Sequence, residues 1–591
     1  MSPPTPTALA GPTFTIDVGA DRRPISPDIY GMNFADPALA RELGMTVRRW
    51  GGNATTRYNW EADTSNRASD WYFETLPEDN ADRARLPDGS AADRFVAEGR
   101  AAGVGTLLTV PLIGWTARAG SRSCSFSVAK YGAQEATDPF WPDCGNGRRP
   151  DGTPLVGNDP RDANTAIDPA FVGGWVDHLV ETFGDAAHGG VAYYNLDNEP
   201  MLWHETHRDV FPRGLDYDGL RDRTLAYAAA VKDADPSAKT LGPAEWGWTG
   251  YFWSARDAEG GGAWWNNPTD RLAHGDVPLA AWYLGQMREA ERASGRRLLN
   301  YFDLHVYPQA AGVALAPAGD AATQARRLRS TRSLWDPDYV DESWIAEPVR
   351  LIPRMRDWVD AHYPGTKLAI GEYNWGALDD INGALAQADV LGIFGREGVD
   401  LAMLWDPPAA DDPGAFAFRA FRNYDGVGGR FGETSVRTTA EGGVGSGGDR
   451  GDSGVAIHAA LRGSDDALTV VAINTSLSAV TSRIDIRGYQ ARGGRQFVYD
   501  GTDLARLRPG GEVYPKGYPR QTVSLTLGPM SITVIELWRG IPEASDTPRP
   551  SATAQIPTTP SPTQSTPSPT EPTATAPDAS RVRVYLPIGW R

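Results

Sequence analysis

The chain has 591 residues, enough to bury more than one hydrophobic core. Its 57 Lys and Arg residues against 75 Asp and Glu residues give a formal net charge of −18. Such an acidic chain argues against nucleic acid as a partner, because binding to a phosphate backbone needs clustered basic side chains. No uninterrupted apolar run approaches the roughly 20 residues that span a bilayer, so the sequence predicts no membrane span.

The two ends of the chain carry little apolar pattern. Residues 1–12 are predicted to be disordered and lack the basic and apolar regions of a signal peptide. Residues 541–580 form a linker rich in Pro, Thr and Ser, which is typical of exported proteins, and residues 581–591 form a short tail. We give the linker more weight and expect a secreted, extracellular protein whose signal peptide has been removed.

Residues 26–412 alternate short apolar runs with longer amphipathic or loop-rich segments, which is typical of β/α units around a parallel sheet. Eight such runs match the strand count of a (β/α)8 barrel, also called a TIM barrel. They begin near residues 29, 46, 104, 191, 239, 301, 367 and 401. The long inserts after the third and fifth runs are expected to be loops over one mouth of the barrel.

The insert after the third run holds both cysteines of the chain, Cys124 and Cys144. Two cysteines cannot complete a four-ligand zinc site. In an exported protein we expect them to form a disulfide, and in a cytoplasmic protein two free thiols. The same insert offers Glu135, Asp138 and Asp143 among many carbonyl groups, and a structural calcium ion is one hypothesis for these oxygen ligands.

Residues 413–540 change to short alternating runs separated by Gly, Asp and Ser, which predicts an all-β sandwich without helices. Within residues 13–25 the run "FTIDV" is expected to add one strand to this sandwich. The predicted sandwich runs are "FAFRAFRNYD", "VAIHAAL", "LTVVAINTS", "SRIDIRG", "RQFVYDG", "TVSLTLG" and "SITVIELW". A "GVGSGG" run at residues 443–448 lacks a βαβ context, so we interpret it as a glycine-rich loop.

Polar residues gather where the predicted barrel strands end, and in this fold the active site lies at that end. The fourth run ends in Asn198 and Glu199, and the seventh contains Glu372. Two carboxyl groups on one barrel mouth suit cleavage of a glycosidic bond, in which one protonates the leaving oxygen and the other attacks the anomeric carbon or activates water. The alternative for each glutamate is an ordinary charge at the rim. The "HETH" run at 204–207 lacks the spacing of a zinc protease.

Five long segments resemble glycoside hydrolase family 44: "RRWGGNATTRYNWEADTSNRASDWYFE", "NLDNEPMLWHETHRDV", "TLGPAEWGW", "FDLHVYP" and "IGEYNWG". The resemblance covers residues 14–538. It implies an endo-β-1,4-glucanase or xyloglucanase of a retaining barrel clan. It also implies that Glu199 is the acid/base and Glu372 the nucleophile, which agrees with their places on the fourth and seventh strands.

The other residues expected to bind substrate follow from their places at the strand ends. Asn198 would donate to a sugar 2-hydroxyl and Tyr307 would hold the Glu372 carboxylate, while either Arg48 or Arg49 would face inward. Aromatic rings serve as platforms for sugar faces or as core residues, and the sequence leaves both readings open for each Trp. The full set of expected binding residues is Asn198, Tyr307, Asn53, Trp60, Trp71, Trp246, His305, Trp375, Trp405 and Arg49.

The sequence thus predicts a monomeric, retaining endo-glycosidase that acts on β-1,4-linked polysaccharide such as xyloglucan, carboxymethyl-cellulose or mixed-linkage glucan. Its reaction requires no cofactor, since a carboxyl pair is sufficient. One alternative is the same fold acting on mannan or xylan. The other is a non-catalytic scaffold that only binds polysaccharide, for which a carboxyl pair would have no purpose.

Overall fold

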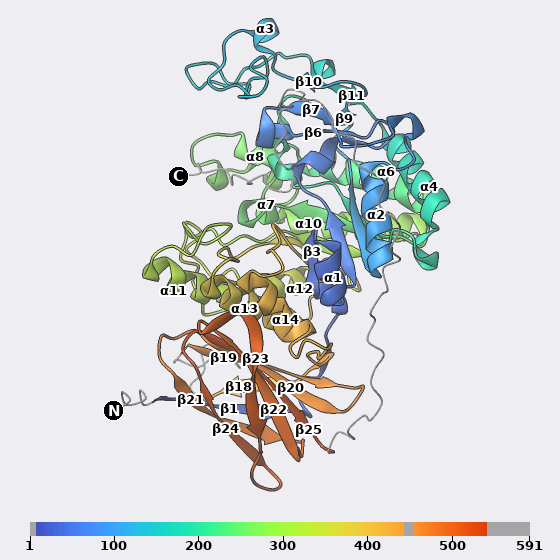
Figure 1. The fold of residues 1–591 in the computed structure, drawn as a ribbon. Coiled ribbons are helices and arrows are strands. Elements are labelled where there is room, and N and C mark those ends of the chain that lie inside the picture. The colour runs from blue at the N-terminus through green and yellow to red at the C-terminus, as the bar shows by residue number, and fades with distance from the viewer. Residues whose placement is uncertain (1–7, 442–453, 541–591) are drawn as a thin grey trace, which may run out of the picture.

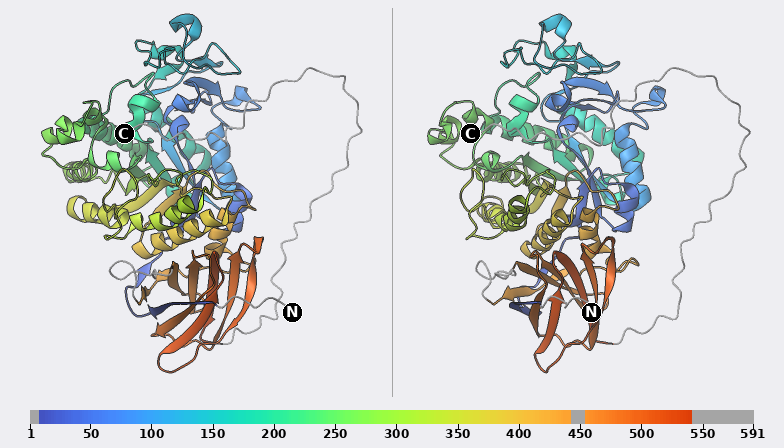
Figure 2. Two further views of the ribbon diagram at one scale, coloured as in Figure 1. Left: turned by 90° about the vertical axis from the view of Figure 1, so that its left-hand side faces the viewer. Right: turned by 60° about the vertical axis from the view of Figure 1, so that its left-hand side comes forward.

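The computed structural model describes residues 8–441 and 454–540. They form a barrel of eight parallel strands surrounded by helices and, beneath it, a β-sandwich (Figures 1 and 2). The predicted fold class is therefore confirmed. The expected linker 541–580, the tail 581–591 and the glycine-rich run 443–448 lie outside the described residues.

The barrel closes in the order β3-β4-β8-β12-β13-β14-β15-β16, with every neighbouring pair parallel. Each of the eight predicted apolar runs contains one of these strands. Their bounds are β3 (Gly31–Asn33), β4 (Val47–Trp50), β8 (Gly105–Val110), β12 (Tyr193–Leu196), β13 (Lys239–Glu245), β14 (Tyr301–Leu304), β15 (Lys367–Tyr373) and β16 (Leu401–Leu404).

Helices cover the outside of the barrel and return the chain from each strand to the next. Most begin at a side-chain cap, such as Asp168 before α4 or Ser90 before α2, which satisfies backbone N–H groups at the helix start. The main helices are α1 (Pro37–Glu42), α2 (Ala91–Ala102), α4 (Pro169–Phe183), α6 (Tyr217–Ala234), α10 (Leu279–Ser294), α11 (Ala321–Ser330), α12 (Leu351–His362) and α13 (Ile381–Glu397). Shorter helices are α5 (Trp203–Thr206), α7 (Trp248–Phe252), α8 (Ala255–Ala258) and α9 (Thr269–Ala273).

The run "FAFRAFRNYD" was predicted to be the first sandwich strand, and this prediction is wrong. It belongs to α14 (Pro413–Arg422), which follows the eighth strand and packs against α13. Phe416 and Phe418 are both buried, and so are the alanines between and after them. A short apolar run fits a helix as well as a strand. Arg419 and Arg422, partly exposed and three residues apart, fit one face of a helix, and Pro413 at the first helical position is a helix-start signal.

Two chain segments, one between β4 and α2 and one between β8 and α4, together form a capping insert over the barrel mouth at the carboxyl ends of the strands, at the top of Figure 1. Its four-stranded sheet has the order β10-β7-β6-β5, and a second ribbon pairs β9 with β11. Cys124 and Cys144 form a disulfide within the insert, with their Cα atoms 5.6 Å apart. The elements are β5 (Tyr58–Asn59), β6 (Thr64–Asn66), β7 (Glu74–Pro77), β9 (Trp115–Ala117), β10 (Ser123–Cys124), α3 (Val128–Tyr131) and β11 (Asn164–Ala166).

The sandwich consists of a four-stranded sheet, β18-β1-β21-β24, and a seven-stranded sheet, β2-β17-β19-β20-β25-β22-β23. Strand β1 (Leu9–Asp17) begins within the range 1–12 that was predicted to be disordered, and β2 (Arg23–Pro24) joins the larger sheet. The remaining strands are β17 (Thr434–Ser435), β18 (Arg437–Ala440), β19 (Val455–Arg462), β20 (Ala467–Asn474), β21 (Val480–Arg487), β22 (Gly493–Asp500), β23 (Asp503–Val513), β24 (Gln521–Leu527) and β25 (Ser531–Trp538).

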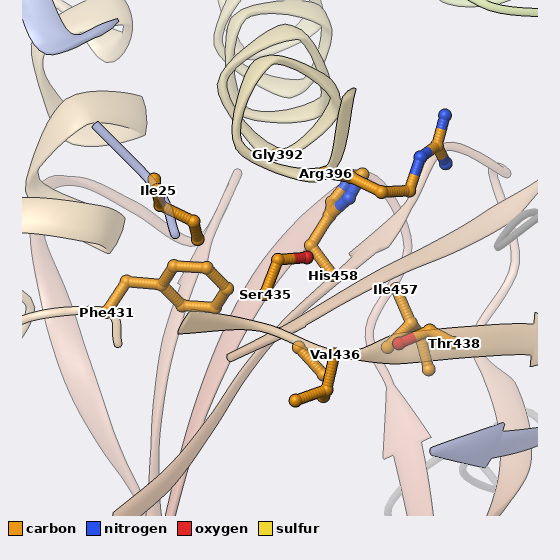
Figure 3. Close-up of a pocket in the computed structure, with 10 residues that line it drawn as sticks. Ile25, Gly392, Arg396, Phe431, Ser435, Val436, Thr438, Ile457 and His458 are labelled. Carbon is orange, nitrogen blue, oxygen red and sulfur yellow. The ribbon is translucent and has the colours of Figure 1, made fainter. Parts of the chain in front are cut away.

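The barrel rests on the sandwich through α13 and α14 (Figure 2). His458 of β19 approaches Asp389 of α13 at 3.0 Å, and both side chains are buried. Gly392 faces the same histidine, as Figure 3 shows, and a Cβ at that position would lie 2.2 Å from its ring. The close approach of helix and sheet therefore depends on the missing side chain at residue 392. Among the described residues, no helix is long and apolar enough to cross a membrane.

Candidate active site

The turn after β12 directs Glu199 toward the barrel axis. Asp197 and Glu199 both have positive φ, 69° and 45°, a conformation that costs free energy in non-glycine residues and persists only where other contacts hold it. The Asp197 carboxylate supplies those contacts. It accepts hydrogen bonds from Thr56 Oγ1, from the Asn198 backbone N–H and from two backbone N–H groups of the loop after β8. These contacts hold the turn at Asp197 and Glu199 and thereby direct the Glu199 carboxyl group toward the barrel axis.

Glu372, at the end of β15, is held on both carboxylate oxygens. Arg49 Nη1 donates to Oε1 at 2.6 Å and Tyr307 Oη donates to Oε2 at 2.8 Å. The Glu372 side chain is 6% exposed and that of Arg49 is fully buried. Two donors, Arg49 and Tyr307, fix the orientation of the carboxylate.

Arg49 is the inward-facing member of the Arg48–Arg49 pair. Its guanidinium also donates to Asn33 Oδ1 at 2.8 Å, to Asn195 Oδ1 at 3.2 Å and to Asn198 Oδ1 at 3.1 Å. Arg48 turns the other way and lies 4.3 Å from the centre of the Phe95 ring. Successive strand residues face opposite sides of a sheet, so only one of the two arginines can reach the barrel interior.

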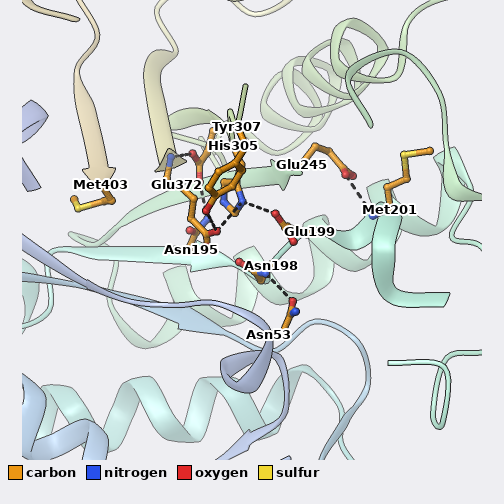
Figure 4. Close-up of polar contacts among 12 residues, drawn as sticks. Asn53, Asn195, Asn198, Glu199, Met201, Glu245, His305, Tyr307, Glu372 and Met403 are labelled. Carbon is orange, nitrogen blue, oxygen red and sulfur yellow. Dashed lines mark hydrogen bonds and ion pairs between the residues drawn. The ribbon is translucent and has the colours of Figure 1, made fainter. Parts of the chain in front are cut away.

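Glu199 and Glu372 face each other beside His305 (Figure 4). One carboxylate oxygen of each glutamate and a ring nitrogen of His305 all lie within 4.8 Å of one another. His305 Nδ1 is 3.1 Å from Glu199 Oε1 and 3.5 Å from Glu372 Oε2. Both glutamates are largely buried and the imidazole is fully buried.

Burial raises the pKa of Glu199; the hydrogen bond with His305 opposes this effect and the negative charge of Glu372 adds to it. Burial lowers the pKa of His305, but the charges of Glu372 and Glu199 outweigh burial and raise that pKa above its usual value. A raised pKa keeps the Glu199 carboxyl protonated to higher pH than an exposed glutamate, which favours a role as general acid. Glu372, in contrast, pairs with a cation. The environments of the two glutamates therefore give them different roles.

Asn198 lies between the carboxyl pair and the capping insert. Its Oδ1 accepts from Arg49, and its Nδ2 donates to Asn53 Oδ1 at 3.1 Å. Asn53 begins a short 3-10 helix just after β4. The amide of Asn198 keeps one N–H that neither contact uses, because an NH2 group has two hydrogens.

Glu245, at the end of β13, does not face the pair formed by Glu199 and Glu372. Its Oε2 accepts from the Met201 backbone N–H at 3.3 Å, and burial raises its pKa well above the usual value. Figure 4 shows its carboxyl group directed at Met201, away from Glu372.

The predicted Trp platforms divide into core and rim residues. Trp375 is fully buried and donates to Ser330 Oγ, Trp246 is 8% exposed in a small apolar cluster, and Trp60 packs on α4 with Nε1 bonded to the Phe171 carbonyl. Protein covers Trp375 and Trp246, so neither offers an open face to a sugar ring, whereas Trp60 is partly exposed beside α4 and its role stays a prediction. Trp71 and Trp405 remain at the mouth, where both are partly exposed.

The predicted calcium ligands do not come together. The Asp138 carboxylate is paired with Arg122, Asp143 accepts from Ser127 and caps the start of α3, and Glu135 is exposed. Across residues 8–441 and 454–540, the one group of three or more His, Cys, Asp or Glu ligand atoms within 4.8 Å of one another is the Glu199, His305 and Glu372 cluster. The carboxyl groups of Glu135, Asp138 and Asp143 do not converge on one point, but calcium also takes carbonyl oxygens as ligands, so the calcium site stays a prediction.

Sequence reasoning missed three polar residues of the site: Asn33, Asn195 and Asp70. Asn33 and Asn195 both accept from Arg49, and the Asp70 carboxylate accepts from Asn53 Nδ2. A signal existed for the first two, because each is a polar residue inside a buried strand. No pattern distinguished Asp70, which lies in a short 3-10 helix of the insert.

Comparisons with known proteins show which family this chain resembles. The sequence model of glycoside hydrolase family 44 matches residues 64–310. Endoglucanase A of Paenibacillus lautus is 32% identical over 449 residues, and the match covers 73% of this chain and 60% of that protein. The chain therefore spans less than two thirds of that curated relative.

Two solved structures match most of the described fold. The bifunctional glucanase-xylanase CelM2, from a metagenome library, is 43% identical with a TM-score of 0.85, and the match covers 90% of this chain and all of that one. The family 44 xyloglucanase of Paenibacillus polymyxa, solved with xyloglucan, is 29% identical with a TM-score of 0.73 and the same coverage. On the strength of these matches and of the barrel-and-sandwich fold they share, this chain belongs to glycoside hydrolase family 44.

Proposed function

We propose that the protein is a retaining endo-glycosidase that cleaves β-1,4-glucan backbones by double displacement, with Glu372 as nucleophile and Glu199 as acid/base. The observation that carries the proposal is the approach of the Glu199 and Glu372 carboxylate oxygens to within 4.8 Å. Retaining enzymes separate their carboxyl groups by about 5–5.5 Å, whereas inverting enzymes need about 6.5–9.5 Å to place a water between them.

In the first step the Glu372 carboxylate attacks the anomeric carbon, and Glu199 gives its proton to the departing glycosidic oxygen. Arg49 and Tyr307 hold the nucleophile in place. Positive charge develops on the sugar ring, and the nearby Glu372 carboxylate stabilises it. The free N–H of Asn198 is placed to donate to the sugar 2-hydroxyl, an interaction that strengthens in the transition state.

In the second step Glu199, now a carboxylate, takes a proton from water, which attacks the glycosyl-Glu372 ester and releases the sugar with its original configuration. His305 is placed to support this change of role, because its Nδ1 faces Glu199 directly. Neither step uses a metal ion or cofactor, so we expect full activity in EDTA.

The substrate assignment rests on the relatives named above, an endoglucanase and a xyloglucanase. A second candidate substrate is xylan, because CelM2, the 43% identical relative, is named a glucanase-xylanase. Mannan is a third candidate substrate, because a relative from Caldicellulosiruptor saccharolyticus, 30% identical over 493 residues, is named β-mannanase/endoglucanase A; the match covers 34% of that protein. A pure scaffold leaves the carboxyl pair without a purpose.

We further propose an extracellular, monomeric protein. The disulfide between Cys124 and Cys144 supports an oxidising location. The proposed catalytic and positioning groups, including Arg49, Glu199, His305 and Glu372, all come from one chain, so catalysis needs no second copy.

Release of new reducing ends from xyloglucan, carboxymethyl-cellulose, xylan and mannan tests the proposal, with the wild-type protein compared with Glu372→Gln. We expect release from the glucans by wild type, and a loss of at least about 10⁴-fold in Glu372→Gln, because an amide cannot attack the anomeric carbon. Polysaccharide binding by the variant should stay near the wild-type level.

Nuclear magnetic resonance of the first product tests retention separately, since the initial anomer must be β. An α product would exclude double displacement. Release confined to xylan or mannan would keep the mechanism and change the substrate, and binding without release from any polymer would support the scaffold.

A further inference from the structure

A third carboxyl group, that of Asp70, enters the site from the capping insert. Asp70 lies in a short 3-10 helix, Ala68–Trp71, and is half-buried. Both of its carboxylate oxygens lie 3.2 Å from Asn53 Nδ2. Asn53 Oδ1 in turn accepts from Asn198 Nδ2 at 3.1 Å, and Asn198 Oδ1 accepts from Arg49 at 3.1 Å.

The two ends of this chain of hydrogen bonds decide how both amides lie. A guanidinium can only donate, so it holds the oxygen of Asn198 toward Arg49 and the NH2 group toward Asn53. An ionised carboxylate can only accept, so it holds the NH2 group of Asn53 toward Asp70 and its oxygen toward Asn198. Donor and acceptor ends agree, and only one orientation of the two amides satisfies every contact.

We propose that Asp70 is a positioning residue that acts through Asn53 to keep the free N–H of Asn198 directed at the sugar 2-hydroxyl. This proposal rests on the proposed function above. It assigns to the capping insert a part in recognising the 2-hydroxyl at the cleavage point, in addition to covering the barrel mouth.

The charges near Asp70 make its hold on the Asn53 amide depend on pH. Burial raises the pKa of Asp70 to about 7; the Asn53 hydrogen bond opposes the shift, the charges of Glu199 and Glu372 add to it, and Arg57 opposes it. Below that pH the carboxyl gains a proton and with it a donor, so it no longer dictates the orientation of Asn53. Recognition of the 2-hydroxyl should then weaken as pH falls through about 7.

The test compares kcat/KM for a dinitrophenyl β-cellobioside and for its analogue lacking the 2-hydroxyl at the cleaved sugar. Dinitrophenolate leaves without a proton from Glu199, so the rate does not depend on general-acid catalysis. A difference between the two substrates then reports the contact with the 2-hydroxyl. In Asp70→Ala we expect kcat/KM to fall about tenfold for the 2-hydroxy substrate, the effect of one hydrogen bond to a charged group, and less than about twofold for the 2-deoxy substrate. Glu61→Ala, at an exposed acidic residue of the same insert, should change neither rate.

The double variant Asp70→Ala, Asn53→Ala separates a relay from an independent effect. If Asp70 acts through Asn53, the double variant loses no more than Asn53→Ala alone. In Asp70→Asn, which keeps the shape of the side chain, the 2-hydroxyl preference should also fall and should no longer change with pH near 7.

Equal losses on both substrates in Asp70→Ala, or additive losses in the double variant, would overturn the inference. These outcomes differ from failure of the proposed function, in which the wild-type protein would hydrolyse neither the aryl cellobioside nor the glucans. A melting temperature measured for each variant shows that it has folded.

Discussion

At the scale of single residues, Arg49 connects most of the site. Its buried guanidinium donates to Glu372 and to three asparagines, one at the end of β3 and two in or just after β12. A lysine has three donors on one nitrogen and cannot reach acceptors spread around a planar fork. The nucleophile, the 2-hydroxyl contact and the barrel interior are therefore held by one side chain, and a change at Arg49 affects all three together.

The pKa of Glu199 should fall when Glu372 loses its charge. In Glu372→Gln the repulsion between the two carboxylates disappears while the neighbouring cation, Arg49, remains. Infrared difference spectroscopy of the protonated carboxyl band during a pH titration measures this change. The band should disappear at lower pH in Glu372→Gln than in wild type.

The control for this titration is Glu199→Gln, in which the Glu199 component of the band should be missing while those of Glu245 and Asp70 remain. The same raised pKa governs activity in the wild type, because only protonated Glu199 can donate to the leaving oxygen. Activity should be lost as pH rises through the pKa of Glu199. A band that titrates at the same pH with and without the Glu372 charge would show that the two groups do not interact.

At the scale of elements, the sequence predicted the barrel strands well because parallel strands are buried on both faces and form short, continuous apolar runs. The same reasoning failed at α14, whose short apolar run was taken for a strand although Arg419 and Arg422 are spaced as on one helix face. It also overlooked β23, where most of the side chains are exposed and the apolar signal is weak. A short apolar run can belong to a strand or to a helix, and a strand without such a run leaves no signal.

The site was predictable to the extent that it lies at strand ends. Glu199, Glu372, Arg49, His305 and Tyr307 follow from the strand count. The Trp residues did not, because an indole at a strand end can face the cleft or the helices, as Trp405 and Trp375 do. Asp70 was beyond reach, since its place depends on how the whole insert folds over the barrel.

The disulfide should stabilise the insert rather than the barrel. It joins residues 20 positions apart, and closing a loop of that size contributes about 3 kcal/mol by restricting the unfolded chain. We expect the double variant Cys124→Ser, Cys144→Ser to be cleaved by proteases within residues 125–160 while the barrel stays intact. Limited proteolysis with mass spectrometry checks this. Cleavage spread equally over the barrel helices would contradict a local role.

At the scale of the whole molecule, barrel and sandwich should unfold together. Gly392→Ala places a methyl group against the His458 ring and forces α13 away from the sheet, at a cost of about 1–3 kcal/mol. Calorimetry should show one transition at a lower temperature. Two transitions, with only the sandwich affected, would mean that the two parts unfold independently.

The matched control is Gly285→Ala in α10, where a Cβ would meet nothing within 4 Å. Alanine is the better helix former by about 0.8–1 kcal/mol, so this variant should melt slightly higher than wild type. A lower melting temperature for Gly392→Ala and a higher one for Gly285→Ala would show that the loss comes from the contact with the sandwich and not from adding a methyl group to a helix.

The position of β1 also affects how the chain is made. Leu9 pairs with Val480, about 470 residues further along, and β1 lies between two strands that both come from the far side of the barrel. Ribosomes add roughly 5–20 residues per second, so β1 waits on the order of 25–95 s for its partners. The barrel can assemble during that interval, but the face of α13 and α14 that packs against the sandwich stays exposed until the last strands emerge. Late synthesis is therefore the period in which a nascent chain most needs protection from its neighbours.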